Sequence, residues 1–139
     1  FIDKLKVFDF FYLFPHFIMD ISPWPRSISS LKKEISDIRK PFEATPNKKK
    51  LFFDLGPIQD QALLELASKV VISIEELKKG KVSLIKNKIP ISLKNNIQEN
   101  IFNNGGVLKV LCEGLNEISW SGVNGLKRKS SLMEYRYDE

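Results

Sequence analysis

The chain has 139 residues, a formal net charge of +5, one cysteine and one histidine. This length predicts one domain with a core large enough to fold without disulfide bonds or bound metal. The single cysteine excludes an internal disulfide and a multi-cysteine metal site, the single histidine excludes a histidine pair as metal ligands, and 42% hydrophobic residues exclude global disorder.

Aromatic residues are concentrated at the N-terminus, where eight of them lie in the first 25 positions. The apolar run at 7–21 includes two aspartates and Pro15, and it is shorter than the ~20 residues that a membrane-spanning helix needs. Three interpretations stay open: a core segment, an arm docked on a partner, or an interfacial segment at a membrane surface. The residues expected to contact a partner or a membrane are Phe8, Phe10, Phe11, Tyr12, Phe14, Phe17 and Trp24.

A basic region follows this run. Apolar residues at positions 28, 31, 35 and 38 predict an amphipathic helix, which Ser29 or Ser30 can cap. The segment 41–50 contains two prolines and three consecutive lysines, so it predicts an exposed linker. Seven basic residues against three acidic ones at 31–50 leave three interpretations open: contact with RNA phosphates, contact with anionic lipid headgroups, or an ordinary solvated loop. The residues expected to contact an anionic partner are Lys32, Lys33, Arg39, Lys40, Lys48, Lys49 and Lys50.

Two helices are predicted next. Gly56 and Pro57 open the first, because proline suits the first turn of a helix. Ser73 and Glu76 form a capping box for the second, which spans 74–79 and ends at Gly80.

Strands are predicted beyond residue 80. The apolar runs at 82–85 and 89–93 indicate a hairpin, and those at 107–112 and 118–123 indicate two further strands. The predicted fold class is therefore α+β: an aromatic extended or helical N-terminal arm, two or three short helices and a small, mostly antiparallel sheet. The expected divisions are an arm, amphipathic helix and basic linker at 1–50, a small α+β domain at 51–126 and a charged tail at 127–139.

Catalytic groups are sparse. His16 could meet Asp20 only in a helix, which Pro15 disfavours, and Cys112 is expected in the core. The turn at 103–106 lacks the residues of a phosphate-binding loop. We therefore expect a non-enzymatic protein with no catalytic, cofactor-binding or metal-binding residues.

One short motif is similar to a known family. The stretch Asp20-Ile21-Ser22-Pro23-Trp24-Pro25, with Ser27 and Ser29 after it, resembles the Asp-Pro-Ser-Pro-Trp-Pro stretch near the start of cytochrome c oxidase subunit III. The preceding His16-Phe17-Ile18-Met19 is similar in character to what leads that stretch in the family. The resemblance implies a position at a membrane surface and no heme or metal ligand. Since a charged helix follows at Ser30, it indicates a split or divergent piece rather than an intact multi-span subunit.

Three functions are compatible with these features. The first is an accessory or split core subunit of a mitochondrial respiratory membrane complex, peripheral on the inner membrane in a reducing compartment, anchored by its aromatic arm to other protein subunits. The second is a basic RNA-associated protein such as an organellar ribosomal subunit. The third is a small soluble domain that binds a ligand or a protein.

Overall fold

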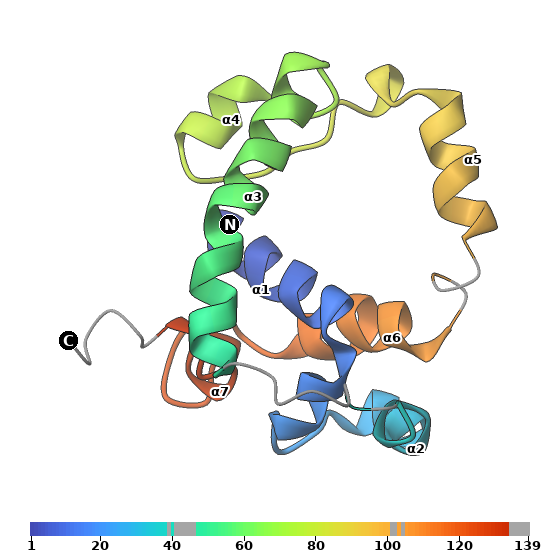
Figure 1. Cartoon of the computed structure of the whole chain (residues 1–139), viewed down its shortest axis with the longest axis vertical. Helices are drawn as coiled ribbons and strands as arrows, with labels where there is room; N and C mark the ends of the chain where they lie inside the picture. The colour runs from blue at the N-terminus through green and yellow to red at the C-terminus, as the bar shows by residue number, and fades with distance from the viewer. Residues whose placement is uncertain (39, 41–46, 101–102, 104, 134–139) are drawn as a thin grey trace.

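The computed structural model describes residues 1–38, 40, 47–100, 103 and 105–133, and every regular element among them is helical (Figure 1). The longer helices lie in the first 100 residues, and short helical turns connect them or follow them. In chain order the elements are α1 (Ile2–Leu13), η1 (Pro15–Asp20), η2 (Arg26–Leu31), α2 (Lys32–Ser36), α3 (Lys48–Ser68), α4 (Ile74–Lys78), η3 (Lys86–Lys88), α5 (Ile91–Glu99), α6 (Gly106–Lys109), the π-helical η5 (Val110–Gly114), η6 (Leu115–Glu117) and α7 (Leu126–Lys129).

The predicted α+β fold is therefore wrong. The only β contact among the described residues is an isolated antiparallel bridge between Ile72 and Leu84, so the predicted strand at 82–85 is reduced to one bridge. The predicted strand at 89–93 instead leads into α5, with Pro90 at its N-cap position. The run at 107–112 lies in α6 and η5, and the run at 118–123 has no strand.

Helix α1 places its aromatic residues in the core. Val7, Phe10 and Phe11 are its buried residues, and their spacing of three and four positions puts them on one helical face. The helix ends before Pro15, which has no backbone N–H and instead starts the 3-10 turns of η1. The aromatic run is thus helical at both of its ends and bent in the middle.

Phe10 lies at the centre of an aromatic cluster that joins three elements. Its ring centroid lies 5.6 Å from that of Phe11, 5.2 Å from Phe14, 5.7 Å from Phe17 and 5.7 Å from Phe52. Aromatic pairs at such distances contribute about 0.5–1.5 kcal/mol each beyond their burial. These contacts fix α1, η1 and α3 against one another.

The main hydrophobic core combines the two ends of the chain. Buried side chains from the first 35 residues pack with buried side chains from 107–132, most of which come from α6, η5, η6 and α7. The division of the chain into arm, domain and tail stays a prediction. The buried members of the main core are Val7, Phe10, Phe11, Ile18, Ile21, Ile28, Ile35, Val107, Val110, Leu111, Leu115, Leu126 and Leu132.

Helix α3 begins earlier than its sequence indicated. The side chain of Asn47 accepts a hydrogen bond from the Lys49 backbone N–H at 2.9 Å and so caps the first turn. Lys48, Lys49 and Lys50, expected in a linker, form that turn, while 41–46 lie outside the described residues. Pro57 lies inside the helix rather than at its start. Asn47 was therefore the decisive start signal, and Gly56-Pro57 was not.

A second, smaller cluster surrounds the end of α3 and the start of α4. Its buried residues are Leu63, Val71 and Ile72. The predicted cap of α4 is confirmed, because the Ser73 hydroxyl accepts a hydrogen bond from the Glu76 N–H at 3.3 Å. Gly80 follows the helix with a φ of +76°, the left-handed conformation that its sequence position predicted. In the described chain, no α5 side chain belongs to either cluster.

Candidate binding surfaces

The aromatic residues expected to contact a partner lie in or against the main core. Phe10 and Phe11 have no exposed surface, because α1 turns them toward α3 and η5. Partly buried side chains pack around them. The expected contact of this set with a partner or a membrane stays a prediction. The partly buried members of the set are Phe8, Tyr12, Phe14, Phe17 and Trp24.

The basic residues expected to meet an anionic partner do not form one continuous patch of free cations. Lys48 pairs with Asp20 at 3.3 Å, and Lys50 pairs with Asp54 at 2.6 Å. Lys32, Lys33 and Lys40 are exposed, Lys49 is partly buried, and Arg39 lies outside the described residues. Their contact with an anionic partner also stays a prediction.

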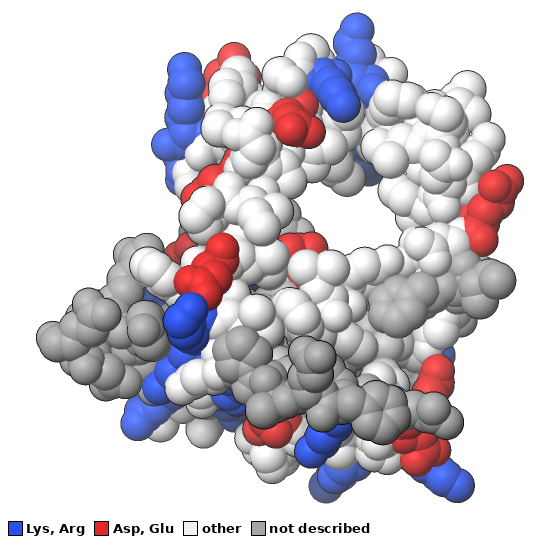
Figure 2. Space-filling view, in the orientation of Figure 1, with Lys and Arg blue, Asp and Glu red and all other residues white. Residues whose placement is uncertain are grey.

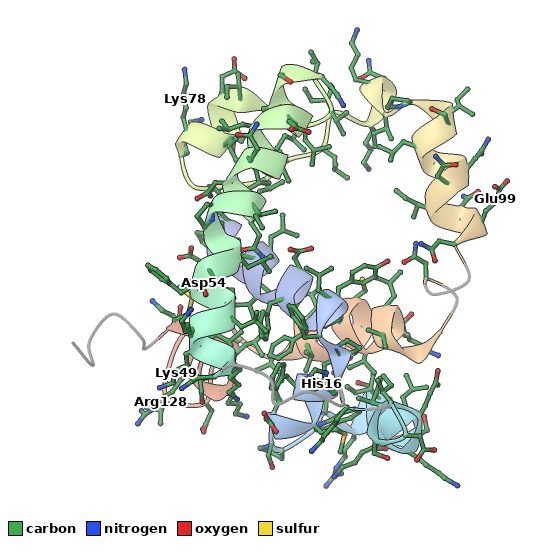
Figure 3. All side chains as sticks on the ribbon, in the orientation of Figure 1. His16, Lys49, Asp54, Lys78, Glu99 and Arg128 are labelled. Atoms are coloured by element: carbon green, nitrogen blue, oxygen red, sulfur yellow. The ribbon has the colours of Figure 1, made fainter. Side chains whose placement is uncertain are left out.

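His16 and Cys112 occupy separate places. The His16 Nε2 atom is buried and has no hydrogen-bond partner among the described residues, while the His16 ring lies 4.1 Å from that of Phe17 (Figure 3). Burial is the main cause that lowers the pKa of His16, Lys40 lowers it further, and Asp20 opposes the shift. Cys112 is exposed on η5, not in the core as expected. Within the described part of the chain, no group of three or more His, Cys, Asp or Glu residues could hold a metal ion.

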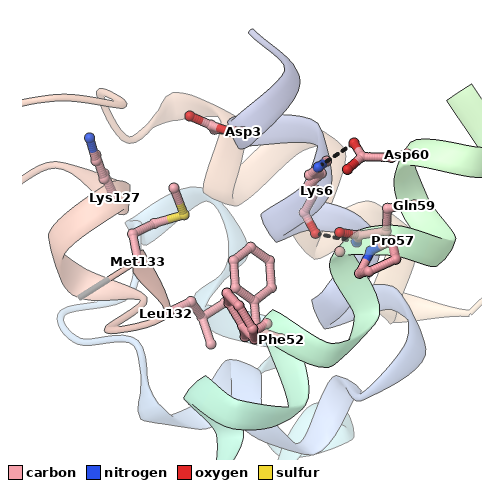
Figure 4. A pocket seen from close by; sticks show the side chains of 11 residues that line it. Asp3, Lys6, Phe52, Pro57, Gln59, Asp60, Lys127, Leu132 and Met133 are labelled. Atoms are coloured by element: carbon pink, nitrogen blue, oxygen red, sulfur yellow. Dashed lines mark hydrogen bonds and ion pairs between the residues drawn. The ribbon is translucent and has the colours of Figure 1, made fainter. Parts of the chain in front are cut away.

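A groove of about 490 Å³ lies where the start of α1, the middle of α3 and the residues around the end of α7 meet (Figure 4). Lys6 and Asp60 cross one wall as an ion pair with a 2.6 Å separation. The other charged groups that line it are Asp3 and Lys127, and the remaining lining is mostly apolar, including Phe52 and Leu132. This lining offers charge and apolar surface for binding, and it contains no serine, cysteine or histidine nucleophile among the residues that the structure describes.

Gln59 ties the groove wall to α1. Its Nε2 atom donates to the backbone oxygen of Lys6 at 3.0 Å and to Asp9 Oδ2 at 2.9 Å. Both neighbours are acceptors, so the amide nitrogen must face them and the orientation of the amide is fixed. The Gln59 Oε1 atom is then left buried without a partner among the described residues. Gln59 thus helps hold α1 on α3.

A surface that the sequence analysis missed runs from the end of α4 to the end of α5. Residues 78–94 contain six lysines and no acidic residue. Figure 3 places Lys78 at the outer edge of the molecule, and basic side chains project from the same end in Figure 2. Counting charge in this window would have revealed the surface, which we call the α4–α5 surface: residues 78–99.

Apolar side chains interrupt these lysines. Leu84 is 60% exposed, Ile91 is 75% exposed and Ile97 is 50% exposed. None of the α5 side chains is buried within the described structure. Leu93 and Ile97 are four positions apart and lie on the same face of the helix. Helix α5 therefore presents apolar and basic groups together and buries neither within the described chain.

A polar relay attaches α5 to the main core. The Tyr12 hydroxyl donates to Asn103 Oδ1 at 2.6 Å, and Asn103 Nδ2 donates to the backbone oxygen of Ile97 at 2.8 Å. Figure 2 shows an opening through the molecule between α5 and the helices that carry the core. This relay holds the C-terminal turn of α5 beside the opening without burying the helix.

A comparison with known protein families shows which family this chain belongs to. Residues 1–138 match the family described as MC5: ABC-three component (ABC-3C) system Middle Component 5. The chain belongs to this family. No curated protein and no solved structure matches it. A middle component of a multi-component system has protein partners in a larger assembly, so the expectation of other protein subunits is confirmed in that general form.

Membership of the MC5 family corrects the earlier functional expectations. The family belongs to a bacterial ABC-three component system, so the resemblance to cytochrome c oxidase subunit III is not a relationship. The expected function as a subunit of a mitochondrial respiratory complex, and the expected location at the inner membrane, are wrong for the same reason. The RNA-associated and small-domain alternatives gain no support. No helix in the described part of the chain is both long and apolar enough to span a membrane.

Proposed function

We propose that this MC5 protein is a non-enzymatic binding component that holds other protein components of its ABC-three component system in one assembly. The proposal is carried by the exposure of α5. This helix has nine residues, and none of its side chains is buried in the described structure. Its family supplies the kind of partner, because a middle component belongs to a multi-component system. Helix α5 is the element that we assign to the contact.

Short helices depend on packing for their stability. An isolated helix shorter than about 12 residues is marginal in water, and packing of its apolar face normally supplies the missing stability. Helix α5 exposes Ile91 and Ile97 instead of packing them. Full burial of such a side chain contributes about 1.5–3 kcal/mol, so a partner that covers both gains several kcal/mol. A binding role therefore gives α5 the packing that its own chain does not supply.

The groove at the α1–α3 junction is a second surface for the same role. It joins charged groups such as Lys6 and Asp60 to an apolar wall that includes Phe52. We give it second place because its principal ion pair is already formed within the chain at 2.6 Å. The lysines of α5 and of the turn before it form no such pair with the residues described.

Co-purification of purified components tests the proposal. The tagged chain is expressed with the other components of its own ABC-three component system and analysed by size-exclusion chromatography with light scattering. We expect one complex of defined mass that contains the chain. A component from an unrelated ABC-three component system serves as the specificity control. Elution of the chain alone at its own mass of 16.0 kDa, in low and in high salt, contradicts the proposal.

A further inference from the structure

We propose that the partner segment that docks on the α4–α5 surface is an acidic amphipathic helix of another protein component. This inference rests on the proposed function and adds the chemistry of the partner. It follows from two properties of the surface, an excess of positive charge and exposed apolar side chains.

The charge is the first property. Lys81, Lys86, Lys88 and Lys94 are exposed, and none of them forms an ion pair with any residue that the structure describes. The acidic Glu76 lies at the margin of the surface and is held by Lys79 at 2.8 Å. Residues 78–99 contain six lysines and one acidic residue, Glu99, so the surface is strongly positive. Such a surface attracts an acidic partner and speeds its association. Acidic side chains on the partner are the complementary groups.

The exposed apolar side chains are the second property, and they argue against a purely electrostatic contact. Ile91 and Ile97 lie about 120° apart around the helix with Lys94 between them, so a partner that meets all three must cover a broad face of α5. An acidic segment without apolar residues would leave the isoleucines in water. An amphipathic helix laid along α5 supplies both kinds of group, as in helix-in-groove recognition.

The composition of the surface favours a protein over a nucleic acid. Residues 78–99 contain no arginine and no aromatic residue. Recognition of single-stranded nucleic acid uses aromatic stacking and arginine planes, neither of which this surface offers. A membrane-surface helix often carries Trp or Phe on its apolar face, and α5 has neither. An acidic protein helix fits the residues present better than either alternative.

The shape of the molecule leaves room for such a helix. Figure 2 shows the opening beside α5, and Figure 1 shows that α5 stands apart from α3 and α4. Packed helices have axes about 8–10 Å apart, so a partner helix needs one free flank of α5. The relay from Tyr12 through Asn103 ties the C-terminal turn of α5 to the core beside this opening.

Paired substitutions in the full-length chain test the two properties. Ile91→Ser combined with Ile97→Ser should weaken binding of the co-expressed component by about tenfold or more, because the partner's apolar face loses its contacts. Val123→Ser is the matched control, since Val123 is 74% exposed and lies outside this surface.

Lys88→Glu with Lys94→Glu should weaken binding by about tenfold or more through like-charge repulsion. Lys109→Glu with Arg128→Glu is its control, because both residues are exposed and lie outside this surface and outside the groove lining. Circular dichroism verifies that each variant is folded.

Zero-length crosslinking identifies directly which groups of the partner contact the lysines. A carbodiimide joins a lysine amine only to a carboxylate in contact with it, and mass spectrometry of the purified complex then locates the joined residues. We expect crosslinks from Lys86, Lys88 or Lys94 to glutamates or aspartates in one helical segment of the partner. Crosslinks confined to the lysines at 32–50 or 127–129 overturn the inference and leave the proposed function standing.

The remaining outcomes are also decisive. Equal affinity of the α5 variants and their controls, in a complex that still forms, overturns the docking surface alone. Absence of any complex overturns the proposed function and this inference with it.

Two further probes are a 20-nucleotide single-stranded RNA and phosphatidylglycerol vesicles. Binding of either that is lost with Lys88→Glu and Lys94→Glu, while the protein complex persists, assigns the lysines to that ligand and overturns the inference.

Discussion

The Glu34 carboxylate of α2 accepts a hydrogen bond from the backbone N–H of Gly106, the first residue of α6, at 2.8 Å across 72 positions of the sequence. A Cβ atom at position 106 would lie 2.5 Å from Glu34 Oε2, so glycine leaves the space that the carboxylate occupies. The bond also places a negative charge at the start of a helical segment, where backbone N–H groups lack internal partners. Glu34 thereby joins the N-terminal part of the main core to its C-terminal part.

Loss of this carboxylate should destabilise the protein. Glu34→Ala leaves the Gly106 N–H without its acceptor, and we expect the free energy of unfolding to fall by about 1 kcal/mol, as for loss of a helix cap. Glu34→Gln keeps an acceptor oxygen and should lose less. Urea unfolding followed by tryptophan fluorescence measures both. Glu113→Ala is the control, because Glu113 is exposed and should change stability by less than about 0.5 kcal/mol. An Ala variant at position 34 as stable as that control would contradict the role given to Glu34.

Gly114 and Gly56 should respond to alanine in opposite directions. A Cβ atom on Gly114 would overlap the side chain of the buried Ile28, so Gly114→Ala should cost about 1–3 kcal/mol by overpacking. Gly56 lies inside α3, and a Cβ atom added there would meet open space, so Gly56→Ala should stabilise by up to about 1 kcal/mol. Thermal unfolding of the two variants, side by side, checks the contrast. Equal melting temperatures would show that Gly114 does not pack against Ile28.

Val70 holds a conformation that valine rarely adopts. It follows α3 with a φ of +59°, while its N–H donates to Ala67 O and the Val71 N–H donates to Leu66 O, each at 3.0 Å. These two bonds are those of a Schellman motif, in which the residue at this position is usually glycine. Val70→Gly should therefore raise the free energy of unfolding by about 0.5–1 kcal/mol despite the added freedom of the unfolded chain. Val123→Gly, where φ is not positive, should not stabilise, and stabilisation by both variants would refute the strain argument.

His16 should make stability depend on pH. Burial lowers the pKa of His16 from its ordinary value of 6.5, so between 6.5 and the lower folded-state pKa the unfolded chain binds more protons than the folded one. Stability should therefore fall as the pH drops from about 7.5 to about 5.5, and the slope should flatten below the folded-state pKa. Replacement of His16 by Gln should remove this part of the slope. Melting temperatures of both proteins at the two pH values measure it, and parallel slopes would contradict the assignment to His16.

Local signals predicted the local structure well. Ser73 and Gly80 bracket α4 as their sequence context indicated, because a cap and a left-handed glycine act within a few residues. The lack of strands among the described residues could not be inferred in this way. Short apolar runs fit a strand or a buried helix equally, and only tertiary packing separates them.

The run at 107–115 shows the ambiguity most clearly. Its short run of apolar and β-branched residues at 107–112 favours a strand, yet the buried residues are Val107, Val110, Leu111 and Leu115, which follow helical spacing. A window extended to Leu115 contains the helical period, in which apolar residues recur every three or four positions.

The α4–α5 surface was missed for a different reason. Its six lysines are spread over 78–94, across the end of one helix and the start of another, and they form no run like the three lysines at 48–50. Burial of Phe10 and Phe11 agrees with one of the three interpretations of the N-terminal run, but the sequence could not select it, since the burial depends on the C-terminal part of the core, which no N-terminal pattern indicates.

Hydrogen exchange of α5 tests the central claim most directly. The backbone amides of Ile91–Glu99 are compared, by mass spectrometry, in the chain alone and in the complex with the other components of its ABC-three component system. We expect α5 to exchange fast in the free chain, because it buries no side chain in the described structure, and to gain protection of about tenfold or more in the complex. An α5 that exchanges at the same rate in both samples, while protection appears elsewhere on the chain, would contradict the assignment of α5 to the partner contact.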